Sequence, residues 1–205
     1  MQLSLLLFAA IFLISLLLTM VGLGGGLIFS PLFIILGFPK SVAASASLFL
    51  NLIAAGSAAY TYARKRMVDF PLSIPLIISS SLAAPAGAYL NAQLDLKPFL
   101  IVMAVVLALA GLRMLFTPAQ EEQNSLKTSN KVLGGIGIGA CIGLLGGLLG
   151  IGGGVFVVPL LIYMLKTPTK IAAASSTFIV CFSSLTGFLG YVSMQAVNWW
   201  FILPA

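Results

Sequence analysis

The chain has 205 residues, of which 60% are hydrophobic and only 7% are charged. A water-soluble domain carries about 25% charged residues, so this composition excludes a soluble globular protein. The net charge of +6 comes from sparse basic residues at the ends of apolar runs. That pattern is typical of membrane topology signals, and it excludes nucleic acid as a partner. Because the sequence has no histidine and no cysteine pair at metal-ligand spacing, we predict no enzyme activity, no metal and no cofactor.

Apolar runs of about 20 residues are long enough to cross a hydrocarbon core of about 30 Å, and several such runs follow one another here. In chain order, membrane helices are predicted at residues 3–21, 27–36, 42–63, 72–90, 98–116, 132–149, 155–165 and 171–192, with a further helix beginning at Trp199. The first segment lacks the basic start of a signal peptide, so we expect a retained membrane helix. The predicted fold class is all-α, a polytopic transmembrane helical bundle.

An internal repeat organises these segments. The sequence GLGGG at 22–26 matches GIGGG at 150–154, and the seven residues 43–49 match 172–178. Each glycine cluster is followed five residues later by a proline, Pro31 in one half and Pro159 in the other. Fixed-period self-similarity of this kind indicates a duplicated unit.

The only strongly polar stretch, 117–130, is predicted to be the loop that joins two transmembrane repeats, 1–116 and 131–205. The match of Pro75 is Pro204, which lies one residue before the end of the sequence. We therefore expect the second repeat to be incomplete relative to the first.

Basic residues predict the orientation of the halves in the membrane. Arg64, Lys65 and Arg66 form the strongest cluster, which places their loop in the cytoplasm. The matching residues 193–195 carry no charge, whereas the turn that holds Lys40 has a counterpart with two lysines, Lys166 and Lys170. This exchange of charge favours an inverted repeat, although four simple crossings in each half would give a parallel one.

The two glycine clusters are the first candidate site. Consecutive glycines cost about 1 kcal/mol each relative to alanine in a helix, and they leave backbone groups that lipid cannot satisfy. A glycine turn that opens a short half-helix directs free N–H groups, and the positive end of the helix dipole, towards one point. We therefore predict an anion site at these glycines, and a simple packing kink is the alternative. The predicted glycine ligands are Gly24, Gly25, Gly26, Gly152, Gly153 and Gly154.

Hydroxyl and amide side chains follow each glycine cluster on the next helix. They are candidate hydrogen-bond donors to a desolvated anion, and helix packing through small residues is the alternative. The residues concerned are Ser45, Ser47, Asn51, Ser175, Ser176 and Thr177. Lys40, Lys166 and Lys170 flank these helices, where a lysine either extends to the membrane interface or adds counter-charge for an anion.

Small residues and acidic residues complete the pattern. Four glycines spaced by four predict a smooth face against which another helix packs closely, namely Gly135, Gly139, Gly143 and Gly147. Cys141 and Cys181 lie in apolar runs and are predicted to be small buried residues. All four acidic residues lie at loops or boundaries, which disfavours coupling through a carboxylate and favours an anion that leaves down the membrane potential.

The repeated G-[LI]-G-G-G, the proline five residues on and the following A-A-x-[SA]-S-[LT]-F helix resemble the TauE/SafE family of membrane transporters over both halves. The resemblance implies a multi-pass plasma-membrane protein in the lipid bilayer that exports small anions, namely sulfite, organosulfonates or related sulfur and carboxylate anions. The family's repeat has about four helices, so the missing last stretch favours a second hypothesis. In that hypothesis the chain is a non-transporting assembly or sensing subunit. Whether it forms a homo-oligomer is left open.

Overall fold

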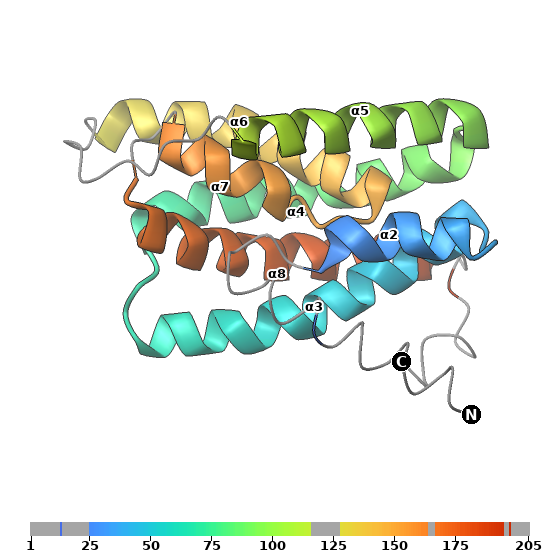
Figure 1. Cartoon of the computed structure of the whole chain (residues 1–205). Coiled ribbons are helices and arrows are strands. Elements are labelled where there is room, and N and C mark those ends of the chain that lie inside the picture. Colours follow the sequence, from blue (N-terminus) through green and yellow to red (C-terminus); the bar gives the residue numbers. More distant parts are fainter. Residues whose placement is uncertain (1–12, 14–24, 116–127, 164–166, 195–196, 198–205) are drawn as a thin grey trace.

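The protein is a bundle of α-helices whose axes lie roughly along one direction (Figure 1). The computed structural model describes residues 13, 25–115, 128–163, 167–194 and 197, and among these it contains no strand. The helices are α2 (Gly26–Ile35), α3 (Lys40–Arg64), α4 (Phe70–Gln93), α5 (Leu96–Leu115), α6 (Thr128–Leu149), α7 (Gly154–Tyr163) and α8 (Thr169–Ser193). In the described residues α3, α4 and α8 are long and apolar enough to cross a membrane. These features confirm the predicted all-α membrane fold.

The helix boundaries follow local sequence signals closely. Pro39 and Pro168 stand immediately before α3 and α8 with nearly the same backbone angles, φ −55° and −54° with ψ 140° in both. Asp69 caps α4, because its carboxylate accepts a hydrogen bond from Leu72 N at 3.2 Å. One boundary was predicted wrongly, since α6 begins at Thr128 and the last three residues of the predicted loop 117–130 belong to it. The predicted helices at 3–21 and from Trp199 fall outside the described residues.

Two helix pairs have matching dimensions. Helices α2 and α7 each have 10 residues, with Pro31 and Pro159 inside them, and α3 and α8 each have 25 residues. The two helices of each pair run in opposite directions: α2 and α7 point to opposite ends of the bundle, and so do α3 and α8 (Figure 1). These directions favour the inverted arrangement over the parallel one. The duplication of the whole unit stays a prediction.

The predicted glycine face of α6 is confirmed as a packing surface, and its partner is α4. A Cβ atom on Gly143 would lie 2.6 Å from Ser80 Cα, and one on Gly147 would meet the backbone carbonyl of Ala84. This close approach allows the two backbones to touch along a continuous line. It also explains why the prediction for Cys141 was wrong, because that residue is on the opposite side of α6 and is exposed. Cys181 is half-buried on α8.

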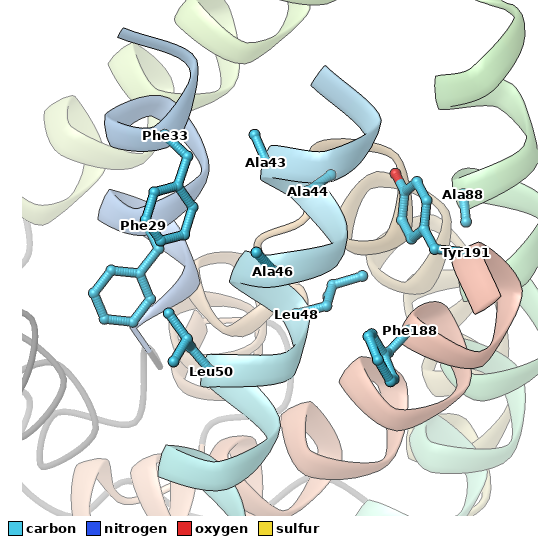
Figure 2. Close-up of a cluster of buried hydrophobic side chains, with 10 residues drawn as sticks. All are labelled: Phe29, Phe33, Ala43, Ala44, Ala46, Leu48, Leu50, Ala88, Phe188 and Tyr191. Carbon is cyan, nitrogen blue, oxygen red and sulfur yellow. The ribbon is translucent and has the colours of Figure 1, made fainter. Parts of the chain in front are cut away.

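An apolar cluster joins the half-helix α2 to the long helices. Figure 2 shows Phe29 and Phe33 of α2 against α3, and Phe188 and Tyr191 of α8 on the other side of α3. The first half of α3 therefore packs against the last part of α8, as antiparallel neighbours must. Large apolar side chains such as Leu82, which is 76% exposed, point outward, where lipid rather than water is expected to cover them.

Candidate functional site

The start of α2 and the second glycine cluster lie against each other in the middle of the bundle. Gly26, the first residue of α2, packs on the backbone of Ile151, so that a Cβ atom added there would lie 2.6 Å from Ile151 O. Helix α7 begins three residues after Ile151, and from this point α2 and α7 run apart (Figure 1). The positive ends of two helix dipoles therefore start from one place. Gly25 precedes α2 directly, whereas Gly24 is outside the described residues.

The second break is a tight glycine turn. Gly150, Gly152 and Gly153 have φ of 73°, 73° and 83°, a left-handed backbone that side chains other than glycine adopt only under strain. The amides of Ile151 and Gly152 both donate to Gly146 O, at 3.0 and 3.2 Å. These bonds close the end of α6 and reverse the chain before α7 begins.

The carbonyl groups at the end of α6 and in the break have no donors within their own helix, and lipid supplies none. Six consecutive carbonyls, from residue 147 to residue 152, each accept a hydrogen bond from a side chain of another helix. In order, the donors are Tyr191 Oη (3.0 Å), Asn91 Nδ2 (2.7 Å), Ser30 Oγ (2.6 Å), Ser47 Oγ (2.7 Å), Asn51 Nδ2 (3.2 Å) and Ser183 Oγ (2.7 Å). They come from α2, α3, α4 and α8, so four helices meet at this one segment.

Asn51 has the largest number of partners in this set. Besides its bond to the carbonyl of Ile151, its Nδ2 donates to Ser184 Oγ at 2.9 Å. Its Oδ1 accepts from Gly26 N at 3.4 Å, so the amide joins both breaks. Asn51 is fully buried, and a Cβ atom on Gly152 would collide with its Nδ2 and with Ser184 Oγ.

The remaining predicted hydroxyls lie elsewhere. Ser45 donates to Val42 O of its own helix at 3.0 Å, and Thr177 donates to Ala173 O at 2.8 Å. Ser175 Oγ accepts from Asp69 N at 3.1 Å, which ties α8 to the start of α4. Ser176 is buried at the position that matches Ser47, but the corresponding segment of the first break, 22–24, is outside the described residues.

Thus Gly26, Ser47 and Asn51 contact the second break, whereas Ser45, Ser175 and Thr177 form their hydrogen bonds with other groups. Sequence reasoning missed four donors to the carbonyls of residues 147–152, namely Ser30, Asn91, Ser183 and Tyr191, and it also missed Ser184, whose hydroxyl accepts from Asn51. Their only signal was that each is a polar side chain inside an apolar helix, where an unpaired polar group is costly.

The flanking lysines lie at the helix ends. Lys40 Nζ donates to the backbone carbonyl of Asn91, near the end of α4, where a cation complements the negative end of the helix dipole. Lys170 is exposed in the first turn of α8, and Lys166 is outside the described residues. Lys40 therefore interacts with the end of α4, and Lys170 is exposed at the start of α8.

Comparison with known proteins identifies the family to which the chain is related. The sulfite exporter TauE/SafE family matches residues 7–205. The chain is 27% identical over 209 residues to "Probable membrane transporter protein YunE" of Bacillus subtilis (strain 168), covering 90% of this chain and 77% of that one. It is 27% identical over 194 residues to a "Probable membrane transporter protein" of Xylella fastidiosa (strain 9a5c), covering 88% of this chain and 70% of the relative.

A third relative is archaeal. "Probable membrane transporter protein MJ0441" of Methanocaldococcus jannaschii is 26% identical over 188 residues, covering 89% of this chain and 70% of that one. No solved structure matches the chain. With apolar spans and a family match over nearly its whole length, the chain is a multi-pass membrane protein that belongs to the TauE/SafE sulfite exporter family.

Proposed function

We propose that the protein exports small anions, namely sulfite, organosulfonates or related sulfur and carboxylate anions, across the plasma membrane through a central site at the paired breaks. The observation that carries this proposal is the contact of Gly26 with Ile151, which brings the starts of α2 and α7 together. Two helix N-termini at one place favour negative charge. Transport, and not an enzymatic reaction, is the proposed activity.

The bonded carbonyls support the same proposal. Carbonyl oxygens are partially negative and would repel an anion, but those of residues 147–152 are each bonded to a side-chain donor. Ser47 and Asn51 then hold the break in shape. The N–H groups of Gly152 and Gly26 donate to Gly146 O and Asn51 Oδ1 and so fix the turn, which leaves the N–H groups of Gly25, Gly153 and Gly154 as the proposed contacts to the substrate. Ser45, Ser175, Ser176 and Thr177 have a supporting role in helix packing.

The proposed driving force is the membrane potential. Asp69 caps α4 and Asp95 lies between α4 and α5, so both are at helix ends. A charge that crosses 100 mV gains about 2.3 kcal/mol, and a dianion that leaves a negative interior gains about twice that. Export of this kind needs no carboxylate relay within the membrane.

The test is flux from proteoliposomes that are loaded with sulfite or a small sulfonate and held at a defined potential. Gly152→Ala and Gly26→Ala are expected to lower the flux roughly tenfold or more, which corresponds to about 1.4 kcal/mol of lost binding. The matched control is Gly137→Ala, because nothing lies within 4 Å of a Cβ atom at that exposed position of α6. The control is expected to keep the flux of the unmodified protein.

Two results would overturn parts of the proposal. Full flux through Gly152→Ala, in protein that still elutes as one species, would remove the site from the second break. No flux and no binding for any anion in a panel of sulfite, sulfonates, sulfate and short carboxylates would instead support a non-transporting assembly or sensing subunit.

A further inference from the structure

The turn after α3 concentrates positive charge at one end of the bundle. Arg64, Lys65 and Arg66 are consecutive, and all three are exposed. Arg64 is the last residue of α3, a helix long and apolar enough to cross a membrane, and Lys65 and Arg66 follow it, so the three lie at the level of the lipid headgroups. Basic residues at this level attract anionic lipids of the adjacent leaflet.

The backbone of Arg66 is strained, and the strain is avoidable. Its φ is 53°, and it is the only non-glycine residue with positive φ in the described part of the chain. Its N–H donates to Ala63 O at 3.0 Å and the next N–H donates to Tyr62 O at 3.1 Å, which is the hydrogen-bond pattern of a Schellman helix end. Glycine is the favoured residue at this position, because it has no Cβ atom.

The same motif ends α2 with the favoured residue. Gly37 has φ 88°, its N–H donates to Ile34 O at 2.9 Å, and Phe38 N donates to Phe33 O at 3.1 Å. One chain thus uses glycine at one helix end and arginine at the equivalent place of another. When a strained position holds a residue other than glycine, although glycine would remove the strain, the side chain at that position is inferred to have a function.

A second cation of the cluster is held in place by an aromatic ring. The guanidinium carbon of Arg64 lies 5.7 Å from the centroid of the Tyr60 ring, one turn earlier on α3. Tyr60 is 65% exposed, and tyrosine is typical of the membrane–water interface. The nearest acidic residue along the chain, Asp69, uses its carboxylate to cap α4 through Leu72 N.

We propose that Arg64, Lys65 and Arg66 bind the phosphate headgroups of anionic phospholipids. This inference goes beyond the proposed transport and does not depend on it. Arginine forms paired hydrogen bonds with phosphate, which glycine at position 66 would not provide. The demand for a guanidinium at that position therefore accounts for the strain.

The test compares lipid binding and stability in the same variants. Purified protein in detergent is titrated with phosphatidylglycerol or phosphatidylcholine, and the retained lipid is measured by native mass spectrometry. Arg66→Gly is expected to weaken phosphatidylglycerol binding about fivefold, the effect of one surface cation, and the triple change to asparagine is expected to remove the preference. Lys97→Asn, at an exposed basic residue of α5, is the control and is expected to leave the preference unchanged.

Without added lipid, Arg66→Gly is expected to raise the melting temperature by about 2–4 °C, because it relieves the left-handed strain. The combination of higher stability and weaker lipid binding separates a binding role from a structural one. If Arg66→Gly and the triple change both retained phosphatidylglycerol as well as the unmodified protein does, the cluster would act only as a topology signal and the proposal would be wrong. An unchanged or lower melting temperature would remove the strain argument.

Discussion

Replacement of Asn51 by leucine tests the interpretation of the paired breaks most directly. Leucine has the same number and branching of side-chain heavy atoms but no polar atom, so the change removes the hydrogen bonds at 2.9, 3.2 and 3.4 Å to Ser184 Oγ, Ile151 O and Gly26 N. It leaves the buried backbone groups of Ile151 and Gly26 without this partner. The question is how much stability depends on one amide.

Two kinds of measurement set lower and upper limits on the stability lost in Asn51→Leu. Hydrogen bonds between membrane helices average about 0.6 kcal/mol, because the unfolded chain in the membrane also finds partners, which gives roughly 2 kcal/mol for the set. A buried group left unsatisfied costs about 1–3 kcal/mol, which gives roughly 2–6 kcal/mol for two groups. Because Ile151 lies in a break rather than in a regular helix, we expect a loss of about 2–4 kcal/mol in the free energy of unfolding.

The assay is unfolding of purified protein in mixed micelles, with anion flux measured in parallel. Ser57→Ala is the matched control on the same helix, because Ser57 is exposed and its hydroxyl bonds only the Ala54 carbonyl, at 2.8 Å. The control is expected to change stability by less than about 0.5 kcal/mol. A loss below about 0.5 kcal/mol for Asn51→Leu would refute the reasoning, since the breaks would then be held together by other contacts.

Two further changes test the supporting structure. Gly143→Ala places a Cβ atom against the Ser80 backbone and is expected to lower the free energy of unfolding by about 1–3 kcal/mol. The control Gly137→Ala is expected to leave it unchanged or to raise it by up to about 1 kcal/mol. Equal effects of the two changes in thermal unfolding would contradict the close contact of α4 and α6. Asp69→Ala removes the cap of α4 and is expected to lower the free energy of unfolding by about 1 kcal/mol. Asp69→Asn can still cap the helix and is expected to lower it by less. Equal losses for the two variants would show that the charge of Asp69, and not its hydrogen bond, stabilises the helix start.

Much of the fold could be predicted because it depends on local signals. Apolar runs bounded by Pro39, Pro168 and the basic cluster at 64–66 mark the ends of long helices, and those ends lie within a few residues of their predicted places. The glycines at every fourth residue of α6 indicated a packing face, because four residues make about one helical turn. The sequence did not identify α4 as the partner of that face.

The candidate site was predicted only in part, and two neighbouring serines show why. Ser45 and Ser47 are both fully buried on α3, yet the first bonds its own helix at Val42 O and the second bonds Gly150 O, 103 residues away. Two residues apart on a helix, they face different sides. A serine in an apolar helix can bond either its own turn or another helix, so its sequence position alone does not decide between them.

The amino-acid sequence was enough to establish a helical membrane protein with two glycine clusters, because hydrophobicity and the lack of a side chain are properties of single residues. The packing of the helices was needed to show that Gly26 contacts Ile151 and that the carbonyls of 147–152 accept hydrogen bonds from Ser30, Ser47, Asn51, Asn91, Ser183 and Tyr191. Those contacts depend on how α2, α3, α4 and α8 pack around the end of α6. These carbonyls have no backbone donor and lipid offers no hydrogen bonds, so the side chains of the surrounding helices supply them.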